Sequence, residues 1–314
     1  MTRLRYLLAA VALVGGNLAF AAPFAYVPNE GSGSVSVIDT ATDAVTNTLQ
    51  VGGKPRGIAV SRDGKRLFVS DQSTGALMVH DPASGTVVGR VRLGASPEAI
   101  YLSPDGTSIA AAVEEANEVV IVDIGTLREV RRIAMRGKNP EHAVWSPDGK
   151  WLLVSAEDGD SIDIVDVAAA RIAKSVQVGT RPRGIGFLPD GSRAYVAAEL
   201  ANVVVVIDMK DPSVIARIPA ATRSNGIAVH PDGKRVYVSA GGANVVQAID
   251  TATNTIVATI DVGRRPWNMA LTPDGRKLYV ACGRSNAVAV IDTATNAKVA
   301  EIAVGELPWG VAIR

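Results

Sequence analysis

Seven positions along this chain vary in residue type although the segments around them are near-copies of one another. They lie 42 or 43 residues apart and, in chain order, are Arg56, Glu98, Glu141, Arg183, Asn225, Trp267 and Trp309. Tryptophan and arginine are enriched at contact hot spots. We therefore expect these residues to bind a protein partner or a small ligand.

A second set of varied residues follows an apolar segment of each copy. It consists of Glu30, Asp71, Glu114, Glu157 and Glu199, with Gly241 and Gly283 at the matching positions. The two sets predict an acidic arc over the second to fourth copies and an arginine–tryptophan arc over the fifth to seventh, which Arg223, Arg264 and Arg265 join. Two interpretations stay open. One is a charge-segregated binding face with two exposed tryptophans, and the other is a solvated rim that keeps the protein soluble.

The near-copies themselves indicate the fold that must position these residues. The glycine of a recurrent Asp-Gly turn is found at Gly64, Gly106, Gly149, Gly191, Gly233 and Gly275. The aspartate that ends an apolar run adds a seventh copy, at Asp39, Asp81, Asp123, Asp166, Asp208, Asp250 and Asp292. A period of this length with four short strand signals per copy is typical of a propeller blade. We predict an all-β, seven-bladed propeller with four-stranded blades.

The seventh blade is predicted to be split between the two ends of the chain. Its innermost strand is "WGVAI" at 309–313, and its other three strands lie within 24–50. Pairing these segments closes the ring and removes exposed sheet edges. Residues 23–314 are thus expected to form a single domain.

Acid–base and metal chemistry have few candidates in this ring. His142, beside Glu141, could act as a base or a metal ligand, and a hydrogen-bonded histidine in the channel wall is our preferred interpretation. A lactonase-like hydrolase would hold a divalent cation with channel oxygens, for which the candidates are Glu98, Glu141, Glu157 and Asn225. Arg56 and Arg183 would compete with a cation, and three scattered histidines argue against haem, quinone and copper cofactors. We therefore predict no catalytic residue, metal or cofactor, and leave enzymatic activity open.

Residues 1–22 have the pattern of a secretory signal peptide, with two arginines, an apolar run and a small-residue motif at 19–21. No cysteine follows the run, so no lipoprotein anchor is expected, and no later segment is apolar enough to span a membrane. The net charge of +1 and the single cysteine, Cys282, argue against nucleic acid as a partner and against disulfide chemistry. We expect a periplasmic or secreted monomer.

Two of the copies resemble the YVTN family of β-propeller repeats: "AYVPNEGSGSVSVIDTATDAVTNTLQVGGKPRGIAV" at 25–60 and "LYVACGRSNAVAVIDTATNAKVAEIAVGELPWGVAI" at 278–313. The resemblance covers nearly the whole chain after residue 22 and implies a secreted or cell-surface propeller without specifying an activity. The layout is also similar to that of periplasmic propellers linked to pyrroloquinoline quinone-dependent alcohol catabolism. That similarity implies a periplasmic dehydrogenase as a partner, and a structural role at the cell surface is the alternative.

Overall fold

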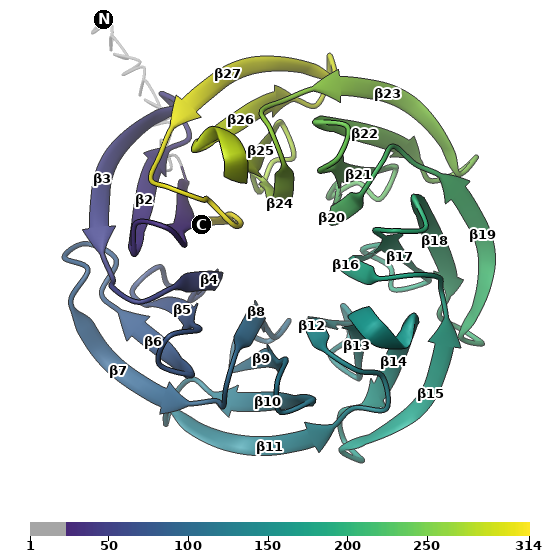
Figure 1. The fold of residues 1–314 in the computed structure, drawn as a ribbon, viewed down its shortest axis with the longest axis horizontal. Helices are drawn as coiled ribbons and strands as arrows, with labels where there is room; N and C mark the ends of the chain where they lie inside the picture. Colours follow the sequence, from purple (N-terminus) through teal and green to yellow (C-terminus); the bar gives the residue numbers. More distant parts are fainter. Residues whose placement is uncertain (1–22) are drawn as a thin grey trace, which may run out of the picture.

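The computed structural model describes residues 23–314 and shows seven four-stranded antiparallel sheets arranged as blades around one axis (Figure 1). Six blades are built from consecutive strands, and the seventh combines the last strand with the first three. The predicted seven-bladed propeller is confirmed. The predicted signal peptide, residues 1–22, lies outside the described residues. Within 23–314, no helix is long and apolar enough to cross a membrane.

Each blade begins at the axis with its innermost strand and ends at the rim. Blade 1 comprises β4 (Pro55–Val60), β5 (Leu67–Asp71), β6 (Ala76–His80) and β7 (Val87–Arg92), and blade 2 comprises β8 (Pro97–Leu102), β9 (Ser108–Val113), β10 (Glu118–Asp123) and β11 (Arg128–Ala134). Blade 3 comprises β12 (Pro140–Trp145), β13 (Trp151–Ala156), β14 (Ser161–Asp166) and β15 (Arg171–Gln177), and blade 4 comprises β16 (Pro182–Phe187), β17 (Arg193–Ala198), β18 (Val203–Asp208) and β19 (Ser213–Pro219). Blade 5 comprises β20 (Ser224–Val229), β21 (Arg235–Ala240), β22 (Val245–Asp250) and β23 (Thr255–Asp261), and blade 6 comprises β24 (Pro266–Leu271), β25 (Lys277–Cys282), β26 (Ala287–Asp292) and β27 (Ala297–Ala303). Blade 7 comprises β28 (Ala312–Ile313), β1 (Phe24–Asn29), β2 (Ser34–Asp39) and β3 (Ala44–Gln50).

The hydrophobic core lies between neighbouring blades. Phe68 of blade 1 and Ile109 and Val120 of blade 2, for example, belong to one buried cluster. Because each blade is covered on both faces, the second and third strands read as continuous apolar runs, such as "VVVVI" in β18. The apolar residues of the repeat are thus buried between blades, and polar residues are found at the ends of the strands.

The innermost strands approach one another closely near the axis. The innermost strand of each of blades 1 to 6 shifts register after its first residue, as between Pro182 and Ile185, which leaves the next amides unpaired within the sheet. At Gly226 the amide donates to Ser239 Oγ (2.8 Å), whose hydroxyl donates to the Trp267 carbonyl of the next blade (2.5 Å). The bulge therefore ties adjacent blades together at the axis.

Replacing Gly184 with alanine is expected to destabilise the protein. A Cβ there would lie 2.6 Å from the Asn225 carbonyl oxygen and 2.8 Å from the Ile227 amide nitrogen of the next blade. Moving backbone to relieve such overlap costs about 1–3 kcal/mol. Urea denaturation should show that loss for Gly184→Ala. Gly125→Ala, at an exposed turn where the nearest atom is a side-chain oxygen at 3.4 Å, should be close to neutral, and equal effects of the two changes would contradict the explanation.

The ring is closed by a shorter strand than the sequence predicted. Within 309–313, only Ala312 and Ile313 pair with β1, opposite Tyr26 and Ala25. Residues 309 and 310 fall at the position where the other innermost strands have their bulge, and Val311, at the position of the paired Met269, does not pair with β1. The Trp309 amide still donates to the Pro28 carbonyl (3.0 Å), so the split blade closes as predicted.

Candidate functional site

Both sets of varied residues lie at one end of the propeller axis, which we call the mouth face. In blades 1 to 6 the first set occupies the second position of the innermost strand. The second set follows the second strands, except that Asp71 ends β5. Because these residues lie in strands, their backbone positions are more restricted than they would be in a loop.

Main-chain hydrogen bonds hold the two sets next to each other. The Glu199 amide donates to the Arg181 carbonyl (2.8 Å), and the Glu157 amide donates to the Asn139 carbonyl (3.1 Å). Arg181 and Asn139 have φ angles of 60° and 55°, in the left-handed region that suits sharp turns. Each loop residue is thus held beside the residues that lead into the innermost strand of its own blade.

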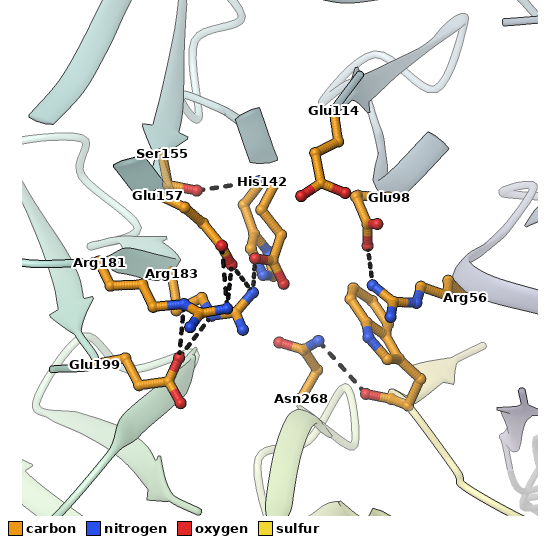
Figure 2. A network of polar contacts seen from close by, with 12 residues as sticks. Arg56, Glu98, Glu114, His142, Ser155, Glu157, Arg181, Arg183, Glu199 and Asn268 are labelled. Carbon is orange, nitrogen blue, oxygen red and sulfur yellow. Dashed lines mark hydrogen bonds and ion pairs between the residues drawn. The ribbon is translucent and has the colours of Figure 1, made fainter. Parts of the chain in front are cut away.

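Arg183 lies at the centre of a buried ion-pair network (Figure 2). Its Nη1 contacts Glu141 and Glu157 of blade 3, and its Nε lies 2.9 Å from Glu199 Oε2 of its own blade. All four side chains are at most 11% exposed. Solvent screens such buried charges little, so each carboxylate depends on the guanidinium beside it.

A second network surrounds Arg56 in blade 1. Its Nη1 contacts Glu98 Oε2 of blade 2, and its Nε lies 3.3 Å from Glu30 Oε2 of blade 7. The buried Glu98 also accepts hydrogen bonds from the Gln72 amide and from Ser96 Oγ, the latter at 3.3 Å. Arg56 therefore links three blades, including the blade that closes the ring.

Three arginines from successive blades converge on Glu199. Arg181 Nε lies 3.4 Å from Glu199 Oε2, while Arg223 Nη1 and Arg265 Nη2 lie 3.8 and 3.1 Å from Oε1. The sequence analysis missed Arg181, although the three arginines lie 42 residues apart at one position of successive copies. That regular spacing is the signal that would have identified them. Glu199 is consequently surrounded by more positive charge than it can neutralise.

The carboxyl groups of the mouth face differ in how readily they ionise. Burial raises the pKa of Glu157 to about 7, against the opposing effect of Arg181. Burial also raises the pKa of Glu98, although Arg56 opposes it. In Glu199 burial acts in the same direction, but Arg183 and the other arginines outweigh it and lower the pKa. Perturbed groups of this kind cluster at functional sites.

His142 is a hydrogen-bonded wall residue, in agreement with the preferred interpretation. Its Nδ1 lies 2.7 Å from the Tyr101 hydroxyl, and its ring stacks on Trp309 with centroids 6.0 Å apart. Burial lowers its pKa to about 3, so the imidazole is neutral near pH 7. The ring packs as an aromatic wall, and its main-chain amide donates to Ser155 Oγ (3.1 Å; Figure 2).

The expectation of two exposed tryptophans on the mouth face is wrong. Trp309 is only 6% exposed, because it is stacked on His142 with the Arg56 guanidinium 5.7 Å from its ring centroid. Trp267 is half-buried rather than fully exposed. The acidic arc also contains Arg183, since carboxylates buried so deeply require a counter-ion within contact distance.

Other predicted residues take local roles. Asp71 caps its own turn, accepting from the Lys54 amide (2.8 Å) and Thr74 Oγ1 (2.7 Å). Glu114 accepts from Ser96 Oγ (3.0 Å) at the edge of the Arg56 network, and Asn225 is buried on β20. These residues lie on the mouth face outside the arginine-centred contacts.

The carboxylates do not fit a divalent cation. Among residues 23–314, no group of three or more His, Cys, Asp or Glu side chains is placed to hold a metal ion. Glu98, Glu141 and Glu157 instead face guanidinium groups, which repel a cation. We derive no metal-dependent step from this site.

Comparisons with known proteins agree with the architecture. A family model described as "Lactonase, 7-bladed beta-propeller" matches residues 83–173 and 168–304, which together make up more than half of the chain. A model described as "YNCE-like beta-propeller" matches residues 20–107. A search of curated proteins found no match.

Many solved structures share the fold at low sequence identity. Hydrazine synthase of Kuenenia stuttgartiensis is 24% identical with a TM-score of 0.77, and the alignment covers 91% of this chain and 99% of that one. A protein of unknown function from Desulfotomaculum acetoxidans DSM 771 is 18% identical with a TM-score of 0.81, covering 92% and 98%. A putative 6-phosphogluconolactonase from Bacteroides fragilis NCTC 9343 is 22% identical with a TM-score of 0.77, covering 95% and 99%. At these identities the similarity extends to the fold alone.

Proposed function

We infer that this chain, which belongs to the lactonase family of seven-bladed β-propellers, is a non-catalytic propeller that binds a protein partner or a small ligand at its mouth face. One observation carries this proposal: residues that break the sequence repeat come together there in buried ion-pair networks. The repeated residues hold the blades. A rigid scaffold that presents varied residues at one end is the usual arrangement of a binding protein.

Fold stability does not account for these charges. Replacing a buried ion pair with well-packed apolar residues is often neutral or stabilising. The same positions carry Asn225, Trp267 and Trp309 in blades 5 to 7, so the propeller accommodates uncharged side chains there. We attribute the charges of blades 1 to 4 to recognition.

We further propose that the protein works in the periplasm or outside the cell. The support is the leader pattern of residues 1–22. The partner class implied by the sequence resemblance, a periplasmic quinone-dependent dehydrogenase, stays a prediction that the capture experiment below addresses.

Lactone hydrolysis is the second candidate function, and membership of the family favours it. With no cation site among residues 23–314, hydrolysis would need a side chain as general base, and Glu157, with a pKa raised to about 7 by burial, suits that role best. Its contacts with Arg181 and Arg183 oppose the role, because they occupy the oxygens that would accept the proton. Binding is therefore the better-supported function.

Replacing Trp267 with alanine is expected to weaken partner or ligand binding about tenfold or more, since half-buried tryptophans are frequent hot spots. The measurement is capture from the periplasmic or secreted fraction, followed by titration of the identified molecule. Trp151→Ala is the matched control, because Trp151 is also half-buried but begins β13 at the opposite end of the axis.

Equal binding by Trp267→Ala and Trp151→Ala would refute recognition at the mouth face. Turnover of glucono-δ-lactone by the wild type that is lost in Glu157→Gln would replace the non-catalytic proposal with the hydrolase.

A further inference from the structure

A pocket of about 390 Å³ lies on the mouth face between blades 5 and 6. Four of its lining residues are arginines and none is acidic; the lining consists of Arg223, Gly241, Gly242, Asn244, Arg264, Arg265 and Arg284. We call it the arginine pocket. Its volume is within the range of small-molecule sites.

The arginine pocket exists because glycine replaces a carboxylate. Gly241 occupies the position that Glu199 has in blade 4 and Glu157 has in blade 3. A Cβ at Gly241 would lie 3.1 Å from Cδ of Arg265, so the absent side chain gives room to the arginine stem. At this position blades 3 and 4 have a glutamate that pairs with arginines, whereas blade 5 has a glycine that leaves space for the pocket.

The charges around the arginine pocket are not balanced. Glu199 is 3.8 Å from Arg223 and 3.1 Å from Arg265, and it also forms ion pairs with Arg181 and Arg183. Its lowered pKa shows that it is already fully ionised near neutral pH. Arg181 and Arg183 also contact Glu157, but Glu199 is the one carboxylate of the described chain that contacts Arg223 and Arg265.

The other two arginines of the pocket are held in place without an acidic partner in the described part of the chain. Arg264 Nη2 donates to the Arg284 carbonyl (3.1 Å), and the Arg284 amide donates to the Arg264 carbonyl (3.1 Å). The Arg264 amide donates to Ser285 Oγ (2.7 Å). Both side chains line the pocket at exposed positions, so an anion that enters it would be attracted by both charges.

We propose that the arginine pocket binds the anionic group, phosphate or carboxylate, of a small ligand. Guanidinium groups form bidentate, charge-assisted hydrogen bonds with both anions. The inference rests on the proposed function and deepens it by naming the chemical class that the mouth face binds. The remaining volume accommodates the uncharged part of the ligand against Gly241 and Gly242.

Titration calorimetry of the full chain with inorganic phosphate, at an ionic strength held constant with sodium chloride, tests the proposal. Arg264→Gln and Arg284→Gln should each raise the Kd about three- to tenfold, because each removes a charge-assisted hydrogen bond. Arg171→Gln, at an exposed position of the outer strand β15, removes the same charge elsewhere and should leave the Kd unchanged. A parallel titration with citrate shows whether phosphate or carboxylate is preferred.

Gly241→Glu gives an independent test that removes no arginine. It places a carboxylate where Glu199 stands in blade 4 and should weaken anion binding at least about tenfold through charge neutralisation. Thermal melting verifies that the variant is folded. Unchanged binding in a folded Gly241→Glu protein, absence of saturable binding of both anions to the wild type, or an equal loss in Arg171→Gln would each overturn the proposal.

The outcomes also separate this inference from the proposed function. Phosphate or citrate binding that depends on Arg264 and Arg284, together with capture that is the same in Trp267→Ala and in Trp151→Ala, would support the inference and contradict recognition by the varied residues. Capture that depends on Trp267, without any anion binding, would do the reverse.

Discussion

Deleting residues 307–314 is expected to destabilise the protein by about 5 kcal/mol or more and to promote its association. The segment supplies two hydrogen bonds between Phe24 and Arg314 (2.8 and 2.9 Å) and one from Trp309 to Pro28, each worth about 1 kcal/mol. Removing the buried Trp309 adds about 3–5 kcal/mol. Since whole domains are stable by about 5–15 kcal/mol, little stability would be left.

Association is expected because the deletion exposes one edge of β1. An unpaired strand edge pairs readily with other chains. Circular dichroism melting should show a midpoint at least about 10 °C lower, and light scattering should show oligomers. The control is Arg314→Ala, which keeps the main-chain bonds to Phe24 and should change stability by no more than about 1 kcal/mol. A monomeric deletion variant that melts like the wild type would disprove closure of the ring by the split blade.

The fold could be predicted from the sequence because each feature of the repeat reflects local backbone geometry or local burial. Asp-Gly turns, apolar runs buried on both faces, and a constant period each report on local geometry. Even the split blade followed from the phase of the repeat. The shorter β28 was not predictable, because the bulge arises from close approach of neighbouring innermost strands, as at Gly184.

The candidate site was predictable as a set of positions, but its contacts were not. The varied positions do gather on one face. Whether Trp309 is exposed depends on His142, which comes from a different blade, and the partners of Arg183 come from three separate segments of the chain. Such contacts depend on side-chain length and direction across blades. The series Arg181, Arg223 and Arg265 was the exception, since its spacing was visible in the sequence.

Replacing Arg183 with methionine is expected to destabilise the protein by about 3–5 kcal/mol at pH 8. The change keeps much of the apolar stem but leaves Glu141, Glu157 and Glu199 buried without their shared counter-ion, and breaking a buried pair from one side has a cost of this size. Arg132→Met is the matched control. Arg132 also contacts two glutamates, Glu118 at 2.8 Å and Glu129 at 2.6 Å, but it lies on an exposed outer strand, where such pairs contribute about 0–1 kcal/mol.

The destabilisation by Arg183→Met should decrease as the pH falls. Without the guanidinium, the pKa of Glu157, which burial already raises, is expected to rise further above the unfolded value of about 4.3, whereas Glu199 keeps its contacts with Arg181, Arg223 and Arg265. A carboxyl with a raised folded pKa binds more protons in the folded state, so stability decreases as pH rises through the interval between the two values. The wild type has a weaker form of this dependence, because burial raises the pKa of Glu157 to about 7, while the lowered pKa of Glu199 acts oppositely. Urea denaturation at pH 5 and pH 8 measures the difference, and a loss that is larger at pH 5, or no larger than that of Arg132→Met, would show that Arg183 does not neutralise the buried carboxylates.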